Sequence, residues 1–109
     1  MIVKNNTKKS VLSEHIIEAK TVRQKVIGLA FCSTPFALCF TTHFGIHTLG
    51  MRFPIDVIIL DSHNQVVRIK TNLQPNRIFV WNPKYSKVLE LPPGTIQKTN
   101  THVGDYLVF

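Results

Sequence analysis

Short apolar runs separated by turn-forming residues dominate the second half of the chain. These runs are rich in β-branched and aromatic residues, a composition typical of strands. The turn-like sequence SHNQ lies between two of them and predicts a β-hairpin over residues 56–71. The pattern predicts strands over six segments: 36–40, 56–61, 66–71, 77–81, 87–91 and 106–109.

The first third of the chain is less regular. Residues 10–20 place apolar side chains at helical spacing but also contain a plausible strand, so both alternatives stay open. Residues 21–30 predict a short helix that Thr21 can cap, with Gly28 near its end.

Many short strands with Gly and Pro between them, together with a short helix, predict a mainly β (α+β) fold. We expect a compact barrel-like or sandwich sheet of short antiparallel strands with one or two short helices. The sequence has no internal repeat and no linker-like segment, which predicts a single domain over residues 1–109. Within it, residues 1–10 are expected to form a loosely ordered basic segment.

The 109-residue chain carries a formal charge of +7, and more than half of this excess lies in residues 1–25. A basic surface attracts nucleic acid and other anions, but this distribution favours a solvated basic end. The N-terminus lacks the apolar region of a secretory signal, and the uncharged stretch Val26–Met51 is interrupted by Gly, Pro, Thr and His. We therefore expect a cytoplasmic protein without a membrane span.

Two cysteines, Cys32 and Cys39, lie in an apolar region. The simplest interpretation is a pair of buried free thiols, although a disulfide between them stays open. Two cysteines alone do not make a zinc site. His43, His47 and Met51 are spaced four apart, but Gly45 and Gly50 argue against the helix that would align them. No metal site and no cofactor are expected.

Glu90 lies within an apolar strand, where a carboxylate must face water or find a partner. Arg52 and Arg77 are suitable partners, because guanidinium pairs bidentately with carboxylate. One interpretation is a polar cleft with two arginines directed at an anionic ligand. The alternative is one or two ion pairs that only fix the strand register.

Three other functions stay open. Asp56 or Glu90 could act as a general base with His47 in a hydrolase-like enzyme. Residues 77–87 interleave aromatic and basic side chains, which suits single-stranded nucleic acid, although this is not favoured because most phenylalanines are expected in the core. An exposed strand edge could pair with another protein.

Four motifs stand out along the chain: HTLGMRFPIDVIILD (47–61), LQPNR (73–77), VLELPPG (88–94) and GDYLVF (104–109), of which the first and third are the strongest. Their order and spacing resemble those of a small prokaryotic family catalogued as domain of unknown function 192. The resemblance implies a β-rich, barrel-like fold with little helix and no established activity. Family members usually have methionine where Ala30 stands and arginine where Lys25 stands.

Eight polar or sulfur-containing positions match the family pattern and overlap the cluster reached from chemistry. They are His47, Thr48, Met51, Arg52, Asp56, Arg77, Glu90 and Asp105. Our leading hypothesis is a binding module in which the two arginines flank a cleft and bind a small anion. In it the acidic residues orient the arginines, and His47 adjusts the charge near neutral pH.

Overall fold

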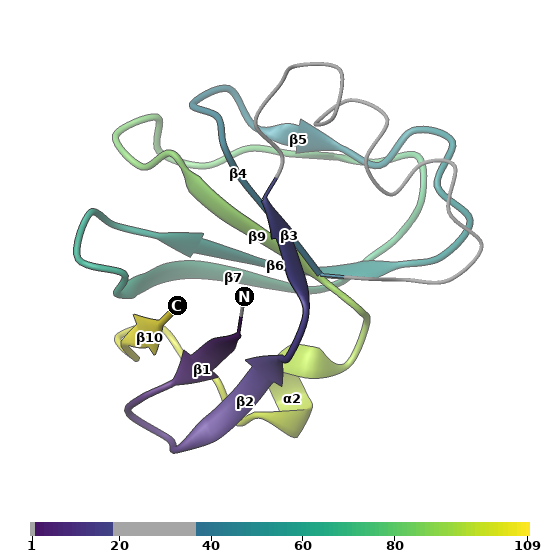
Figure 1. Ribbon diagram of the computed structural model, residues 1–109. Coiled ribbons are helices and arrows are strands. Elements are labelled where there is room, and N and C mark those ends of the chain that lie inside the picture. Colours follow the sequence, from purple (N-terminus) through teal and green to yellow (C-terminus); the bar gives the residue numbers. More distant parts are fainter. Residues whose placement is uncertain (1, 19–36) are drawn as a thin grey trace.

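The computed structural model describes residues 2–18 and 37–109, which form ten strands and one short helix (Figure 1). The predicted helix at residues 21–30 and Cys32 lie outside the described residues. The elements are β1 (Val3–Asn5), β2 (Ser10–Ser13), β3 (Ile16–Glu18), β4 (Ala37–Thr41), β5 (Ile46–His47), β6 (Ile55–Leu60), β7 (Val66–Leu73), β8 (Ile78–Phe79), β9 (Lys87–Leu91), α2 (Thr95–Lys98) and β10 (Leu107–Val108).

The central sheet has five strands in the order β3-β4-β9-β6-β7. All neighbours are antiparallel except β3 and β4, which are parallel. Every residue of β6 is buried, because both faces of this inner strand are covered. The predicted β6–β7 hairpin is confirmed: its turn is closed by Asp61, whose carboxylate accepts hydrogen bonds from the amides of His63 and Gln65.

Alternating residues of the central sheet contribute to two separate cores. On one face, Val57, Ile59 and Val88 pack against a two-stranded layer formed by β5 and β8; we call this the first core. On the other face, Ile58 and Leu89 pack against the sheet β10-β1-β2 and α2. Figure 1 shows β5 at the top of the molecule and β1, β2 and α2 at the bottom.

This layered arrangement confirms the expected mainly β sandwich with little helix. The barrel-like alternative is wrong for the described residues, because their strands form three separate sheets and no closed barrel. Residues 10–18 form strands β2 and β3, which resolves the earlier ambiguity there in favour of strands. The helix α2 was not predicted, because its four residues are too few to show a period.

Part of the segment 1–10, which was expected to be loosely ordered, forms strand β1. Val3 and Asn5 are fully buried in β1, which pairs with both β2 and the C-terminal β10. The Asn5 side chain donates hydrogen bonds to Thr101 and Asp105, nearly at the other end of the chain. Of the basic residues in this segment, Lys4 is the exposed middle residue of β1, and Lys8 and Lys9 follow the strand. None of the helices in the described part of the chain is long and apolar enough to cross a membrane.

Candidate anion-binding site

The predicted arginine–carboxylate cluster does not form. Arg52 and Arg77 are both exposed, whereas Asp56 and Glu90 are buried. Within residues 2–18 and 37–109 there is one ion pair, which joins Lys8 and Asp105. The sequence could not show this separation, because it depends on how β6 and β9 are covered by other elements.

Asp56 links β6 to β7 and to α2 through hydrogen bonds. Its Oδ1 accepts a hydrogen bond from the Asn72 amide at the end of β7, and its Oδ2 accepts one from the Ile96 amide in α2, each at 2.9 Å. Both carboxylate oxygens therefore hold backbone N–H groups that would otherwise lack a protein partner. This explains a buried carboxylate in an apolar strand without a cation.

Thr48 is fully buried and fixes the loop that carries Arg77. Its Oγ1 donates to the Gln74 carbonyl at 2.7 Å and accepts from the Arg77 amide at 2.9 Å. The Thr48 backbone adds two bonds, from its own amide to the Arg77 carbonyl and from the Asn76 amide to its carbonyl. With a longer bond from Oγ1 to the Arg77 carbonyl at 3.3 Å, these contacts hold residues 74–77 against Thr48.

Asp105 is buried near the C-terminal strand β10 and accepts hydrogen bonds from Asn5, the Lys8 ammonium and the His102 amide, each at 2.9 Å. Burial alone would raise the pKa of this carboxyl. The hydrogen bonds from Asn5, Lys8 and the His102 amide, together with the charge of Lys8, outweigh burial, so the pKa is lowered. Asp105 therefore joins the two ends of the chain and lies apart from the arginines.

His47 and Met51 belong to different environments. His47 is exposed on β5 opposite Ile78, and its Nδ1 accepts a weak hydrogen bond from the Leu49 amide at 3.4 Å. Met51 is buried in the first core. Across the described ranges, no three or more His, Cys, Asp or Glu side chains gather closely enough to hold a metal ion.

Glu90 has the most unusual surroundings of the predicted site residues, because it is a buried carboxyl in an apolar environment. It lies on β9 between Leu38 of β4 and Val57 of β6, on the sheet face that forms the first core. Only 6% of its surface is exposed, and the described residues offer it no hydrogen-bond or ion-pair partner. Burial raises the pKa of its carboxyl from 4.5 to about 7. The prediction that arginines pair with Glu90 is wrong. The pKa of about 7 means that the carboxyl changes its protonation state near neutral pH.

Arg77 instead shares a hollow with two basic residues, Arg68 and Lys70, that we did not predict as site residues. Together with Arg68 and Lys70 it lines a hollow of about 310 Å³, which we call the cationic groove. Asn72, Gln74, Ile78 and Phe79 also contribute to its wall. The described lining contains no Asp or Glu.

The alternation of β7 places Arg68 and Lys70 on one side of the sheet. Arg68 lies opposite Ile59 and Lys70 opposite Val57, two first-core residues. The Arg68 guanidinium lies 5.0 Å from the centre of the Phe79 ring, a cation–π distance that holds it against β8. A signal for these residues was present, because VVRIKT carries basic side chains two residues apart.

Cations at this position also have a structural explanation. β7 is an edge strand of the central sheet, and charged side chains on an edge prevent pairing with another sheet. That explanation accounts for Arg68 and Lys70 but not for Arg77, which comes from a separate loop fixed by Thr48.

Cys39 is a free, half-buried thiol on β4. Burial is the largest effect on it and raises the pKa of the thiol, so the group stays protonated near neutral pH. The prediction of a buried free thiol is therefore only partly met at Cys39, which is free but half-buried.

The comparisons with known proteins identify the family. Residues 2–109 match the family DUF192, described as "Uncharacterized ACR", and the chain belongs to it. A UPF0127 protein of Pyrococcus furiosus is 31% identical over 109 residues, which cover 94% of this chain and 93% of that protein. A UPF0127 protein of Thermococcus sibiricus is 32% identical over 108 residues, covering 93% of this chain and 70% of that one.

Two solved structures share the fold. A protein of unknown function from Novosphingobium aromaticivorans superposes with a TM-score of 0.82 at 17% identity, covering 99% of this chain and 82% of that one. A protein from Sinorhizobium meliloti, provisionally described as a transcription regulator, gives a TM-score of 0.75 at 18% identity, covering 98% and 89%. At such identities the likeness concerns the fold alone.

Proposed function

We propose that this DUF192 protein is a binding module whose cationic groove holds a small anionic ligand. One observation carries the proposal: Arg68 and Lys70 from β7 converge with Arg77 from a separate loop on one hollow, whose described lining has no carboxylate. Three cations without neighbouring carboxylates repel one another at close range. A bound anion would relieve this repulsion, so the groove attracts anions.

The chemistry of the groove suits phosphate and carboxylate groups. Each arginine can bind such a group through two parallel hydrogen bonds, and the lysine adds a compact charge. Ile78 and Phe79 supply an apolar wall, and the volume of about 310 Å³ lies at the small end of ligand pockets. A phosphate ester or a small polycarboxylate fits this description better than a polymer does.

The arginines are held in place without the acidic partners that the sequence suggested. The Phe79 ring lies against Arg68, and the hydrogen bonds of Thr48 fix the backbone of Arg77. A cation held by a ring or by its backbone keeps its hydrogen-bond donors available for a ligand, whereas an ion pair would occupy them.

Thermal denaturation with added phosphate, sulfate or citrate tests the proposal. A ligand that binds the folded state raises Tm in proportion to the logarithm of its concentration. We expect this rise to shrink strongly in the double variant Lys70→Ala/Arg77→Ala. Lys84→Ala is the control, because Lys84 is an exposed cation that lies over Tyr85 and outside the groove. Equal loss in the control would indicate non-specific charge attraction and contradict the proposal.

Binding to nucleic acid predicts a different dependence on salt. Three groove cations can release at most about three counterions, whereas a nucleic-acid site that contacts many phosphates gives a steeper slope. A titration with a short single-stranded oligonucleotide at several salt concentrations separates the two functions.

Glu90 favours a second candidate function, acid–base catalysis. A carboxyl that is buried, without a partner among the described residues and half-ionised near neutral pH can accept or donate a proton. Asp56 is less suited, because both of its oxygens already accept backbone hydrogen bonds. Screening chromogenic carboxylic and phosphate esters tests this role: activity lost in a folded Glu90→Gln variant supports it, and activity retained there contradicts it.

A further inference from the structure

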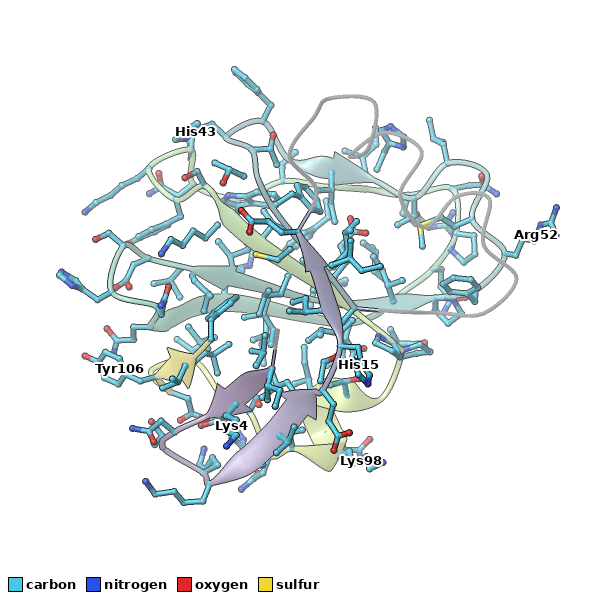
Figure 2. The ribbon with its side chains drawn as sticks, in the orientation of Figure 1. Lys4, His15, His43, Arg52, Lys98 and Tyr106 are labelled. Carbon is cyan, nitrogen blue, oxygen red and sulfur yellow. The ribbon has the colours of Figure 1, made fainter. Side chains whose placement is uncertain are left out.

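The outer layer that carries β5 and β8 is basic and lacks carboxylate side chains. Its two segments, residues 42–54 and 74–86, contain Arg52, Arg77 and Lys84 but no Asp or Glu. Figure 2 shows the Arg52 side chain reaching outward at the right of the molecule, away from Lys4 and Lys98 near the bottom. Such a layer favours contact with a negatively charged partner.

The same layer exposes large apolar side chains. Phe44 is 92% exposed, Ile78 75%, Val80 59% and Leu49 54%. In β8 the neighbouring Phe79 points into the first core, so Ile78 and Val80 point outward. A Cβ added at Gly45 would lie 2.8 Å from a methyl group of Val80, so the chain beside Phe44 contacts Val80 directly. Phe44 and Val80 therefore lie close together, and Ile78 projects from the same side of β8 as Val80.

We propose that this layer docks onto an anionic lipid bilayer, with Phe44, Ile78 and Val80 entering the interface and Arg52, Arg77 and Lys84 contacting headgroup phosphates. Apolar side chains beside basic ones are the combination that binds peripheral proteins to charged membranes. The proposal goes beyond the binding of a small anion and does not require a ligand in the cationic groove.

The composition of the layer distinguishes a bilayer from other partners. A second copy of the chain would bring two basic layers together, which is unfavourable without intervening carboxylates. Single-stranded nucleic acid needs exposed aromatic rings for stacking, but three of the four exposed apolar residues are aliphatic. Aliphatic side chains gain free energy in the acyl region of a bilayer, so a membrane accommodates Ile78 and Val80 as well as the Phe44 ring.

Co-sedimentation of the full chain with lipid vesicles tests the proposal. We expect binding to phosphatidylcholine vesicles that contain phosphatidylserine, weaker binding in high salt, and little binding to phosphatidylcholine alone. The variant Phe44→Ser/Ile78→Ser should bind at least roughly tenfold more weakly. Val103→Ser, which removes an exposed apolar residue outside the layer, should bind like the wild type.

A reporter variant separates insertion from mere adsorption. Phe44→Trp should show a blue-shifted emission with the anionic vesicles, since tryptophan favours the membrane interface. Absence of vesicle binding, equal binding by the serine double variant, or an unshifted emission overturns the proposal. So does preferential binding of single-stranded DNA or an acidic protein through Phe44. Lys70→Ala should weaken phosphate binding but leave vesicle binding unchanged, so the two proposals can fail separately.

Discussion

The hydroxyl of Thr48 accepts a hydrogen bond from the backbone amide of Arg77 at 2.9 Å, across 29 residues of sequence. The same hydroxyl donates to the Gln74 carbonyl, so one buried side chain sets the position of the loop. Arg77 is the groove cation that does not belong to β7. The shape of the cationic groove therefore depends on a residue that does not line it.

Replacing Thr48 should loosen the loop and weaken anion binding together. Thr48→Val keeps the shape but leaves the Arg77 amide and the Gln74 carbonyl without the hydroxyl, which costs about 1–3 kcal/mol. We expect faster hydrogen exchange at residues 74–77 and weaker phosphate binding. Thr48→Ser should restore both, and a valine variant with unchanged exchange would contradict this role.

Asp56 should be a stability residue rather than a ligand-binding residue. Asp56→Ala leaves the buried amide of Ile96 and that of Asn72 without an acceptor, which we expect to cost about 2–4 kcal/mol in urea denaturation. Asp56→Asn keeps one acceptor oxygen and should cost less. Phosphate affinity, measured where both variants are folded, should stay near the wild-type value.

Glu90 should make the protein less stable as the pH rises. Its pKa is about 7 in the folded state and 4.5 as its ordinary value, so the folded state holds the proton more tightly. The unfolding free energy should therefore fall as pH rises from about 4.5 through about 7, by about 3 kcal/mol in total. The cause is the growing cost of an ionised carboxylate in the first core.

Paired variants isolate this effect. Glu90→Gln should flatten the fall and stabilise the protein at about pH 8. The control Glu14→Gln changes an exposed glutamate and should leave the slope as it is. An unchanged slope in Glu90→Gln would show that the carboxyl titrates normally, which would also remove the basis for acid–base catalysis.

Asp105 should have the opposite pH dependence. Its pKa lies below 3.8 in the folded state, so its contribution is present above that pH and is lost as the pH falls through the folded pKa. Asp105→Asn should cost about 2 kcal/mol at neutral pH and reduce the acid sensitivity. Asp61→Asn, at a turn without an ion pair, serves as the control in acid denaturation.

Much of the fold was visible in the sequence because the strands follow local patterns. Residues 87–91 were predicted and observed with the same bounds, and the hairpin of β6 and β7 differs from its prediction by one or two residues at each strand. The closing β1–β10 pair could not be predicted, since it joins segments about a hundred residues apart. Such pairing depends on the cores between the strands.

The site was harder to predict because sequence shows a charge but not its partner. Asp56 was expected in a cleft flanked by arginines and Asp105 among the candidate binding residues. Backbone amides satisfy Asp56, and Lys8 pairs with Asp105. Arg68 was not predicted as a site residue, although its spacing from Lys70 places both side chains on one face of β7. Only the loop geometry set by Thr48 shows that Arg77 joins them.

An NMR titration of the labelled protein with inorganic phosphate addresses the anion-binding proposal most directly. If the cationic groove is the site, the largest saturable shifts should occur at the amides of Arg68, Lys70 and Arg77, and they should disappear in Lys70→Ala/Arg77→Ala. Larger shifts around Lys4 and Lys9 at the far end, or no saturable shift, would contradict the proposal.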